Sequence, residues 1–250
     1  MGNLTIHPMH VGSLTGEMST FTYMRNIGRK ITFPVLAWYI AGADASILVD
    51  TGAPPPAEVP LGADNYEQPP EQSLERGLAG LGVSLDEIEL VVLTHLHWDH
   101  CLNAHLFPKA RFVVQRAELQ YAAAPLPVHW RTYRVRQPST RALLPAESKV
   151  QVVSGDVPLT RGVALAHLPG HTPGLQGVTV ETAVGTYLLA SDNVPFYENW
   201  EGEPPDLPHI PSDLHVDLEA YFQSLARMER LADCVLPGHD PKVLERKAYG

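Results

Sequence analysis

The sequence contains only two cysteines among 250 residues, too few for a disulfide framework. It also lacks long apolar runs, since none approaches the roughly 20 residues of a membrane-spanning helix. Residues 1–14 show no signal-peptide pattern. Basic residues are outnumbered by acidic ones, 18 to 28, and a net charge of −10 argues against binding to nucleic acid or anionic membranes. These absences favour a cytoplasmic protein with neither a nucleic-acid nor a membrane partner.

The overall composition is that of an ordinary globular protein, with 44% hydrophobic and 18% charged residues. We expect a single domain over residues 1–250, because no shift in composition marks a boundary. Six of the 23 prolines lie within residues 51–70, which carry no hydrophobic period. Long irregular segments in compact domains are usually functional covers or linkers. Residues 51–70 are therefore expected to cover a site.

Hydrophobic patterning predicts strands that come in runs, with helices between some of them. The expected strands are residues 34–42, 46–50, 89–94, 111–115, 149–153, 162–168, 176–181, 185–190 and 234–236. Helices are expected over residues 71–82, 116–123 and 216–232. This order indicates a layered α/β protein in which sheets are sandwiched by helices.

Four potential metal ligands fall within six residues directly after the strand at 89–94. They are His95, His97, Asp99 and His100, in the sequence H-L-H-W-D-H. Neutral imidazole and carboxylate are ligands for zinc, iron and manganese. Such a run arises by chance with a frequency on the order of one in a thousand for this composition. The cluster therefore predicts a metal site.

Three further strand ends each offer one residue of ligand type. His171 follows the strand at 162–168, Asp192 follows that at 185–190, and His239 follows that at 234–236. A lone histidine or aspartate after a strand is more often a cap or turn residue. Together with the first cluster, however, the three form a constellation with enough ligands for two metal ions.

These motifs, in this order, resemble the metallo-β-lactamase-fold hydrolase superfamily from about residue 33 to residue 239. The resemblance implies an α/β fold, an αβ/βα sandwich of two facing mixed β-sheets flanked by helices. It also implies two divalent metal ions, with zinc expected first and iron, manganese or cobalt as alternatives. One ion would be held by His95, His97 and His171, the other by Asp99, His100 and His239, and Asp192 would bridge them. Asp50, in the segment L-V-D-T-G, would hydrogen-bond a ligand histidine.

Within that superfamily, the chain looks most similar to the N-acyl homoserine lactonases. Those enzymes build substrate covers before and after the first central strands, here at about residues 10–32 and 51–70. They usually place a tyrosine three residues after the bridging aspartate, where this chain has Pro195. Tyr197 is the expected catalytic substitute if its loop bulges.

The mechanism implied is attack on a lactone carbonyl by a hydroxide that bridges the two metals. Asp99 and Asp192 would be ligands first, and either could pass a proton to the leaving oxygen. The substrate expected is a small neutral ester or lactone. The apolar stretch of Met18, Phe21, Tyr23 and Met24 could line an acyl pocket, form the face of a homodimer or pack in the core. Cys101 and Cys234 are expected to be small buried residues.

Other functions remain open on the same ligands. A thioesterase or a phosphotriesterase would use the same seven residues. A diiron redox protein of this fold would typically carry glutamate where His97 stands. A non-catalytic metal-binding module would need no substrate cover. Only measured turnover separates the enzymes from that last alternative.

Overall fold

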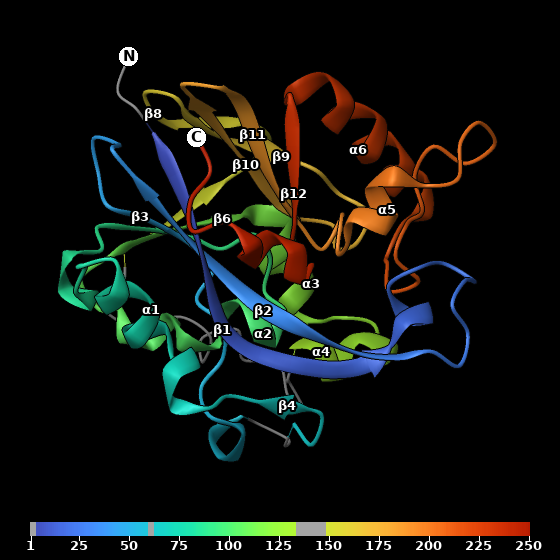
Figure 1. The fold of residues 1–250 in the computed structure, drawn as a ribbon, viewed down its shortest axis with the longest axis horizontal. Coiled ribbons are helices and arrows are strands. Elements are labelled where there is room, and N and C mark those ends of the chain that lie inside the picture. The colour runs from blue at the N-terminus through green and yellow to red at the C-terminus, as the bar shows by residue number, and fades with distance from the viewer. Residues whose placement is uncertain (1–3, 60–62, 134–148) are drawn as a thin grey trace.

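The computed structural model describes residues 4–59, 63–133 and 149–250. Two β-sheets face each other and helices cover their outer faces (Figure 1). The larger sheet has the order β4-β1-β2-β3-β5-β6-β7, and the smaller one β12-β11-β10-β9-β8. The strands of the larger sheet are β1 (Thr5–Glu17), β2 (Lys30–Ala41), β3 (Ile47–Val49), β4 (Tyr66–Glu67), β5 (Leu90–Val92), β6 (Arg111–Gln115) and β7 (Lys149–Val153). Those of the smaller sheet are β8 (Val157–Thr160), β9 (Val163–His167), β10 (Gln176–Thr182), β11 (Gly185–Ser191) and β12 (Cys234–Pro237).

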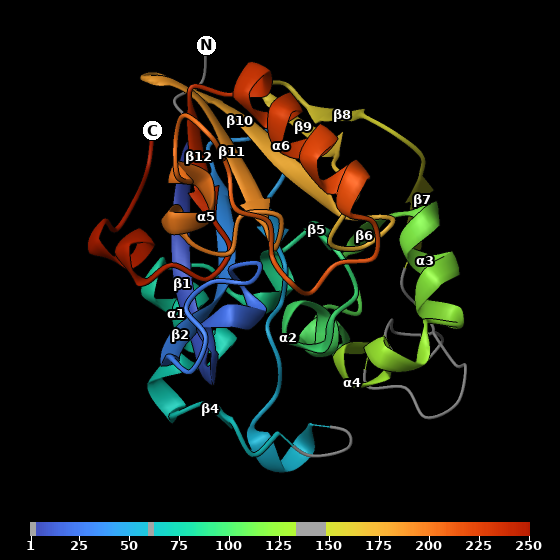
Figure 2. The same cartoon turned by 90° about the vertical axis from the view of Figure 1, so that its right-hand side faces the viewer.

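The helices lie on both outer sides of the paired sheets (Figure 2). They are α1 (Leu74–Gly80), α2 (Trp98–Cys101), α3 (Arg116–Ala123), α4 (Trp130–Tyr133), α5 (Tyr197–Glu201) and α6 (Leu218–Leu231). Within the described ranges, short 3₁₀ helices lie at Met18–Thr20, Pro56–Glu58, Pro70–Gln72, Leu85–Glu87, Leu102–Leu106, Pro127–His129 and Pro241–Glu245. Among the described residues, no helix is long and apolar enough to cross a membrane.

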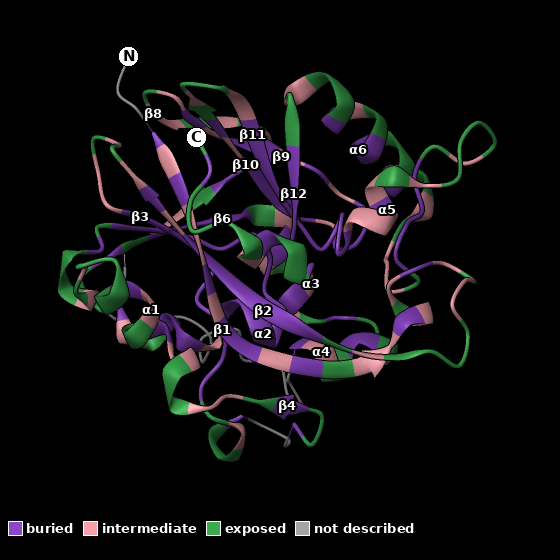
Figure 3. Cartoon of the chain, viewed as in Figure 1, coloured by how far each residue is buried: buried purple, intermediate pink, exposed green. Residues whose placement is uncertain are grey.

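Alternation along the strands divides the core into layers, which appear as the buried interior in Figure 3. In β11, Tyr187 and Leu189 point between the two sheets, whereas Leu188 and Ala190 pack beneath α6. In β5, Leu90 and Val92 join the same inter-sheet cluster. The predicted sandwich of two mixed sheets with flanking helices is therefore confirmed.

The first strand of the fold was not predicted from the sequence. β1 pairs antiparallel with β2 from Thr5 to Glu17, and so includes part of the segment expected to be a cover. A bulge between His10 and Ser13 interrupts the pairing, and Gly12 there has φ 142°. A bulge breaks the period of two, which hides the strand from a search for alternation. The prediction for Cys101 is confirmed, but Cys234 is exposed at the start of β12, so its predicted burial is wrong.

The candidate ligands meet because several strands end at one edge of the sandwich. β3, β5 and β6 are parallel neighbours in the larger sheet, and β11 and β12 are parallel in the smaller one. β9 runs in the same direction as β11, because both are antiparallel to β10. The loops that follow β3, β5, β9, β11 and β12 therefore come together.

Candidate metal centre and pocket

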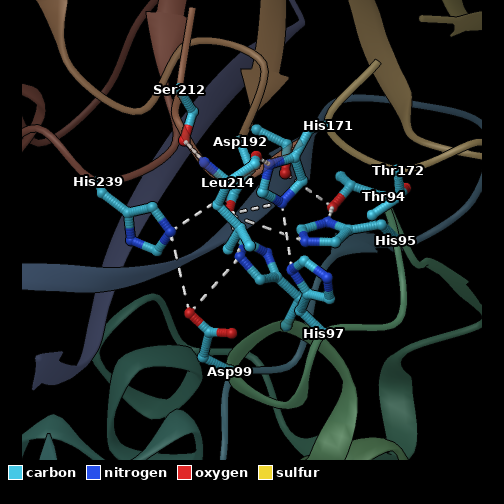
Figure 4. Close-up of polar contacts among 12 residues, drawn as sticks. Thr94, His95, His97, Asp99, His171, Thr172, Asp192, Ser212, Leu214 and His239 are labelled. Atoms are coloured by element: carbon cyan, nitrogen blue, oxygen red, sulfur yellow. Dashed lines mark hydrogen bonds and ion pairs between the residues drawn. The ribbon is translucent and has the colours of Figure 1, made fainter. Parts of the chain in front are cut away.

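The structure brings all seven predicted ligands together, and every one is buried (Figure 4). Their ligand atoms fall into two groups, within each of which the atoms lie no more than 4.8 Å apart. The first group, named here the three-histidine group, comprises His95, His97, His171 and Asp192. The second, the Asp99 group, comprises Asp99, His100 and His239. Each group offers the nitrogen and oxygen donors that a divalent metal requires.

Asp192 lies between the two groups and presents one carboxylate oxygen to each. Its Oδ2 is 3.3 Å from Nε2 of His171 and 3.8 Å from Nε2 of His95. Its Oδ1 is 3.1 Å from Nε2 of both His100 and His239. A carboxylate placed in this way could bind two cations at once.

Some of these atoms have no hydrogen-bond partner although they are buried. Nε2 of His95, Nε2 of His100 and Oδ1 of Asp192 all lack a partner in hydrogen-bond geometry, although Oδ1 lies 3.1 Å from Nε2 of His100. Burying an unpaired polar atom costs about 1–3 kcal/mol, so such atoms need a compensating partner. All three point into the space shared by the two groups, and a metal ion there would satisfy them. The residues present therefore fit divalent metal ions.

Hydrogen bonds at the opposite ring nitrogens orient the histidines. Nδ1 of His171 donates to the carbonyl of Leu214 at 2.7 Å, and Nδ1 of His239 donates to that of Pro34 at 2.9 Å. Because a carbonyl only accepts, each ring carries a proton on Nδ1 and turns Nε2 toward the other ligands, where it can serve as a metal ligand. This arrangement is typical of histidines that bind metals.

Asp50 makes the expected hydrogen bond to a histidine of the site. Its Oδ2 accepts from Nδ1 of His100 at 2.8 Å and from the hydroxyl of Thr94 at 2.7 Å, while Oδ1 accepts from the Thr94 amide at 2.8 Å. Asp50 itself has φ 59°, a left-handed conformation that is uncommon for a residue with a side chain. The turn after β3 thus directs this carboxylate toward the loop after β5, which carries His100.

The pKa values of the histidines shift in opposite directions in the two groups. Burial lowers the pKa of His95, His97 and His171, which favours the neutral imidazoles that bind metals. Burial also opposes the charge on His100 and His239, but the nearby carboxylates, Asp192 foremost, outweigh it and raise both pKa values. These two histidines in turn hold the pKa of Asp192 well below its usual range, against the effect of burial. A negative charge therefore persists at the centre of the site.

A pocket of about 770 Å³ opens onto the ligands. Its apolar lining comes from Leu14, Phe21, Phe33, Ala63, Trp98, Pro127, Trp130 and Leu214. Glu17, Thr20, Asp64, Asn65, Arg131 and Thr132 add polar groups. Both segments expected to be covers contribute, the first through residues 14–21 and the second through residues 63–65. Phe21 lines this pocket, whereas Met24 is 71% exposed.

The structure does not bring Tyr197 to the ligands. The residue before it, Phe196, packs edge-on against Phe21 and Phe33 on the pocket side. As α5 begins, the Tyr197 ring turns the other way, joins the cluster between the sheets and lies 5.9 Å from the Lys242 ammonium. Burial raises the pKa of Tyr197, with Tyr249 adding to the effect. The loop does not bulge in the way that the substitution required.

Two buried polar residues beside the site were missed in the sequence. Glu118 of α3 is fully buried and accepts hydrogen bonds from Leu96, Thr172, Gly174 and Tyr133. The Tyr133 ring packs edge-on against that of His97, with 4.8 Å between centroids. The sequence offered only a weak indication that Glu118 is buried, because the buried face of α3 consists of Glu118 and Ala122 alone.

Residues 31–239 match the model of the metallo-β-lactamase superfamily. The chain belongs to this superfamily. Among curated proteins, an N-acyl homoserine lactonase from Bacillus sp. is 31% identical over 188 residues, which cover 71% of each chain. The N-acyl homoserine lactonase AiiB of Agrobacterium fabrum is 32% identical over 233 residues, covering 85% of this chain and 81% of the relative.

Solved structures agree on the fold. A crystal structure of a B. thuringiensis AiiA variant, with N-decanoyl-L-homoserine at its active site, aligns with a TM-score of 0.77 and 22% identity. The alignment covers 98% of this chain and 96% of the other. The family match and the curated relatives confirm the resemblance of this chain to N-acyl homoserine lactonases and its class, a metal-dependent hydrolase.

Proposed function

We propose that this protein is a dinuclear metal-dependent hydrolase that opens lactones, with N-acyl homoserine lactones as the substrate class. The observation that carries the proposal is Asp192, whose two oxygens face two separate ligand groups at the wall of a pocket. The relatives named as lactonases support the choice of substrate.

Each ligand group would hold one divalent ion. The three-histidine group supplies imidazole nitrogens, and the Asp99 group supplies two imidazoles and a carboxylate, with Asp192 shared. Zinc suits these donors, and iron, manganese and cobalt are alternatives. Bound ions would supply an activated water nucleophile and would polarise the substrate carbonyl. That a hydroxide bridges the two ions stays a prediction.

Asp99 is the better placed of the two aspartates to handle the proton of the leaving group. Asp192 has both oxygens close to ligand imidazoles, so neither is free for proton transfer. Asp99 lines the pocket, is 8% exposed, and lies 3.8 and 3.9 Å from the nearest imidazole nitrogens of its group. Ring opening of a lactone yields an alkoxide that needs a proton, and Asp99 can take the proton that the attacking water gives up and pass it to that oxygen from the pocket side.

The pocket favours a neutral, partly apolar substrate. Phe21, Phe33 and Trp130 offer an apolar wall for an acyl chain. Glu17 and Asp64 also line it, and Arg131 is the only lysine or arginine in the lining that the structure describes. An uncharged lactone therefore fits better than a polyanion, in keeping with the net charge of −10.

The test is parallel turnover of acyl homoserine lactones, aryl lactones, thioesters and paraoxon-type phosphotriesters by the metal-loaded protein. We expect lactones to lead in kcat/KM by at least about tenfold, which corresponds to about 1.4 kcal/mol of transition-state stabilisation. Thioester or phosphotriester rates equal to the lactone rates would overturn the choice of substrate. Turnover of none of them would leave a metal-binding module and overturn the enzyme proposal.

A further inference from the structure

We propose that Glu118 is a positioning residue that fixes the two loops of the three-histidine group relative to each other, with Tyr133 as its partner. The inference rests on the proposed metal site but not on the proposed substrate. Glu118 contacts neither the pocket nor the ligand atoms themselves, so its role is to hold the loops that carry them.

The Glu118 carboxylate joins two loops that are far apart in the sequence. Oε1 accepts from the amide of Leu96 at 2.9 Å, and Leu96 lies between His95 and His97. Oε2 accepts from the hydroxyl of Thr172 at 2.6 Å and from the amide of Gly174 at 3.2 Å. Thr172 directly follows His171. One side chain thus ties together residues adjacent to all three histidines of the group.

Only a carboxylate can satisfy this arrangement. All four partners of Glu118 are donors, including the Tyr133 hydroxyl at 2.8 Å from Oε1. An ionised carboxylate has two oxygens and only accepts, whereas a glutamine of the same shape offers one oxygen and one NH₂ group. That NH₂ group would face either the Leu96 amide or the Gly174 amide, and a backbone N–H cannot turn away to become an acceptor. Glu118→Gln is therefore a disruptive change despite its equal size.

Two further contacts show that the residues around Glu118 are tightly packed. A Cβ atom on Gly174 would lie 2.2 Å from the backbone nitrogen of Glu118, so the loop approaches α3 more closely than any other residue type allows. Tyr133 is fully buried, and its ring packs against His97 while its hydroxyl binds Glu118. His97 is thus held both through its neighbour Leu96 and through the Tyr133 ring.

The Asp99 group is held by different contacts. Asp50 orients His100, and the carbonyl of Pro34 orients His239. Loss of the Glu118 carboxylate should therefore weaken the three-histidine group selectively.

Two variants, each lacking one ligand histidine, allow metal binding to the two groups to be measured separately. His239→Asn keeps all ligands of the three-histidine group, and His97→Asn keeps those of the Asp99 group. Cobalt(II) titration of each metal-free protein, followed by visible absorption against a competing chelator, then reports one group at a time without any substrate. Leu78→Ala, in the buried face of α1, controls for a general loss of stability.

We expect Glu118→Gln to weaken cobalt binding at least about tenfold in the His239→Asn background and less than about threefold in the His97→Asn background. Leu78→Ala should leave both affinities unchanged at a temperature where it is folded. Unchanged binding in Glu118→Gln, or equal weakening of both groups, would overturn the inference. If two metals bind as expected but no lactone is turned over, the proposed function fails and this inference stands.

Tyr133→Phe tests the proposed positioning role even if Glu118→Gln does not fold. It removes one donor to Glu118 and keeps the ring against His97. We expect cobalt affinity of the three-histidine group to fall about threefold or more, with a shifted absorption band. Wild-type affinity together with an unshifted band would contradict the role assigned to the pair.

Discussion

Oδ2 of Asp50 lies 2.8 Å from Nδ1 of His100, and this contact joins the end of β3 to the ligand loop after β5. In Asp50→Asn, one of the two oxygens becomes an NH₂ group facing donors from Thr94 or His100, so the histidine loses its orientation. We expect metal affinity to fall about 10–100-fold, as it does for comparable partners of metal-binding histidines. Equilibrium dialysis with metal analysis measures it.

Asp44→Asn is the matched control. Asp44 is exposed and accepts a hydrogen bond from Thr160, away from the ligand loops. Its amide variant should bind metal as the wild type does. Equal affinity in both aspartate variants would contradict the orienting role of Asp50.

Asp192→Ala removes the carboxylate shared by both groups. Each group loses a ligand, and the charge that attracts both cations disappears. We expect metal content and lactone hydrolysis to be lost together, with kcat/KM reduced at least about 100-fold. Activity retained in this variant would refute the shared position of Asp192.

Tyr197→Phe should leave catalysis intact. The Tyr197 ring packs between the sheets near Lys242 and does not line the pocket. We expect kcat/KM within about twofold of the wild type and a stability change of roughly 1 kcal/mol at most. A loss of tenfold or more in kcat, with unchanged thermal stability, would place the phenol in the reaction after all.

Metal-free protein should be most stable near pH 6.5–7. His95, His97 and His171 have pKa values below the ordinary 6.5 in the folded protein. Below about pH 6.5 the unfolded chain therefore binds more protons than the folded one, and the stability of the folded state decreases as the pH is lowered. His100 and His239 have raised pKa values, so their contribution is complete below pH 6.5 and is lost as the pH rises through those values. Thermal unfolding from pH 5 to 9 with chelator present should show this maximum. A Tm that rises steadily towards pH 5 would contradict it.

Much of the site could be predicted because its ligands follow strands with clear apolar patterns. His95 and His97 come three and five residues after β5, and Asp192 and His239 come within two residues of β11 and β12. Parallel strands carry such residues to a shared edge, so local pattern indicated that these side chains would meet there, and the family resemblance supplied their division into two groups.

The features that the sequence did not reveal have different causes, some local and some from contacts between distant segments. β1 is hidden by its bulge at Gly12, and Glu118 acquires its role only when the loops after β5 and β9 meet above α3. Tyr197 lies away from the ligands for a local reason, because the helix that starts there turns its ring away from the side on which Phe196 packs. The sequence pattern could not show which of two adjacent aromatic residues packs against the pocket-lining Phe21 and Phe33.

The most direct test of the account is a titration of metal-free protein with zinc while hydrolysis of an acyl homoserine lactone is followed by proton release. The account predicts no turnover without metal and a maximum at two zinc ions bound per chain. Turnover that survives complete metal removal, or a fully loaded protein that leaves the lactone intact, would contradict it.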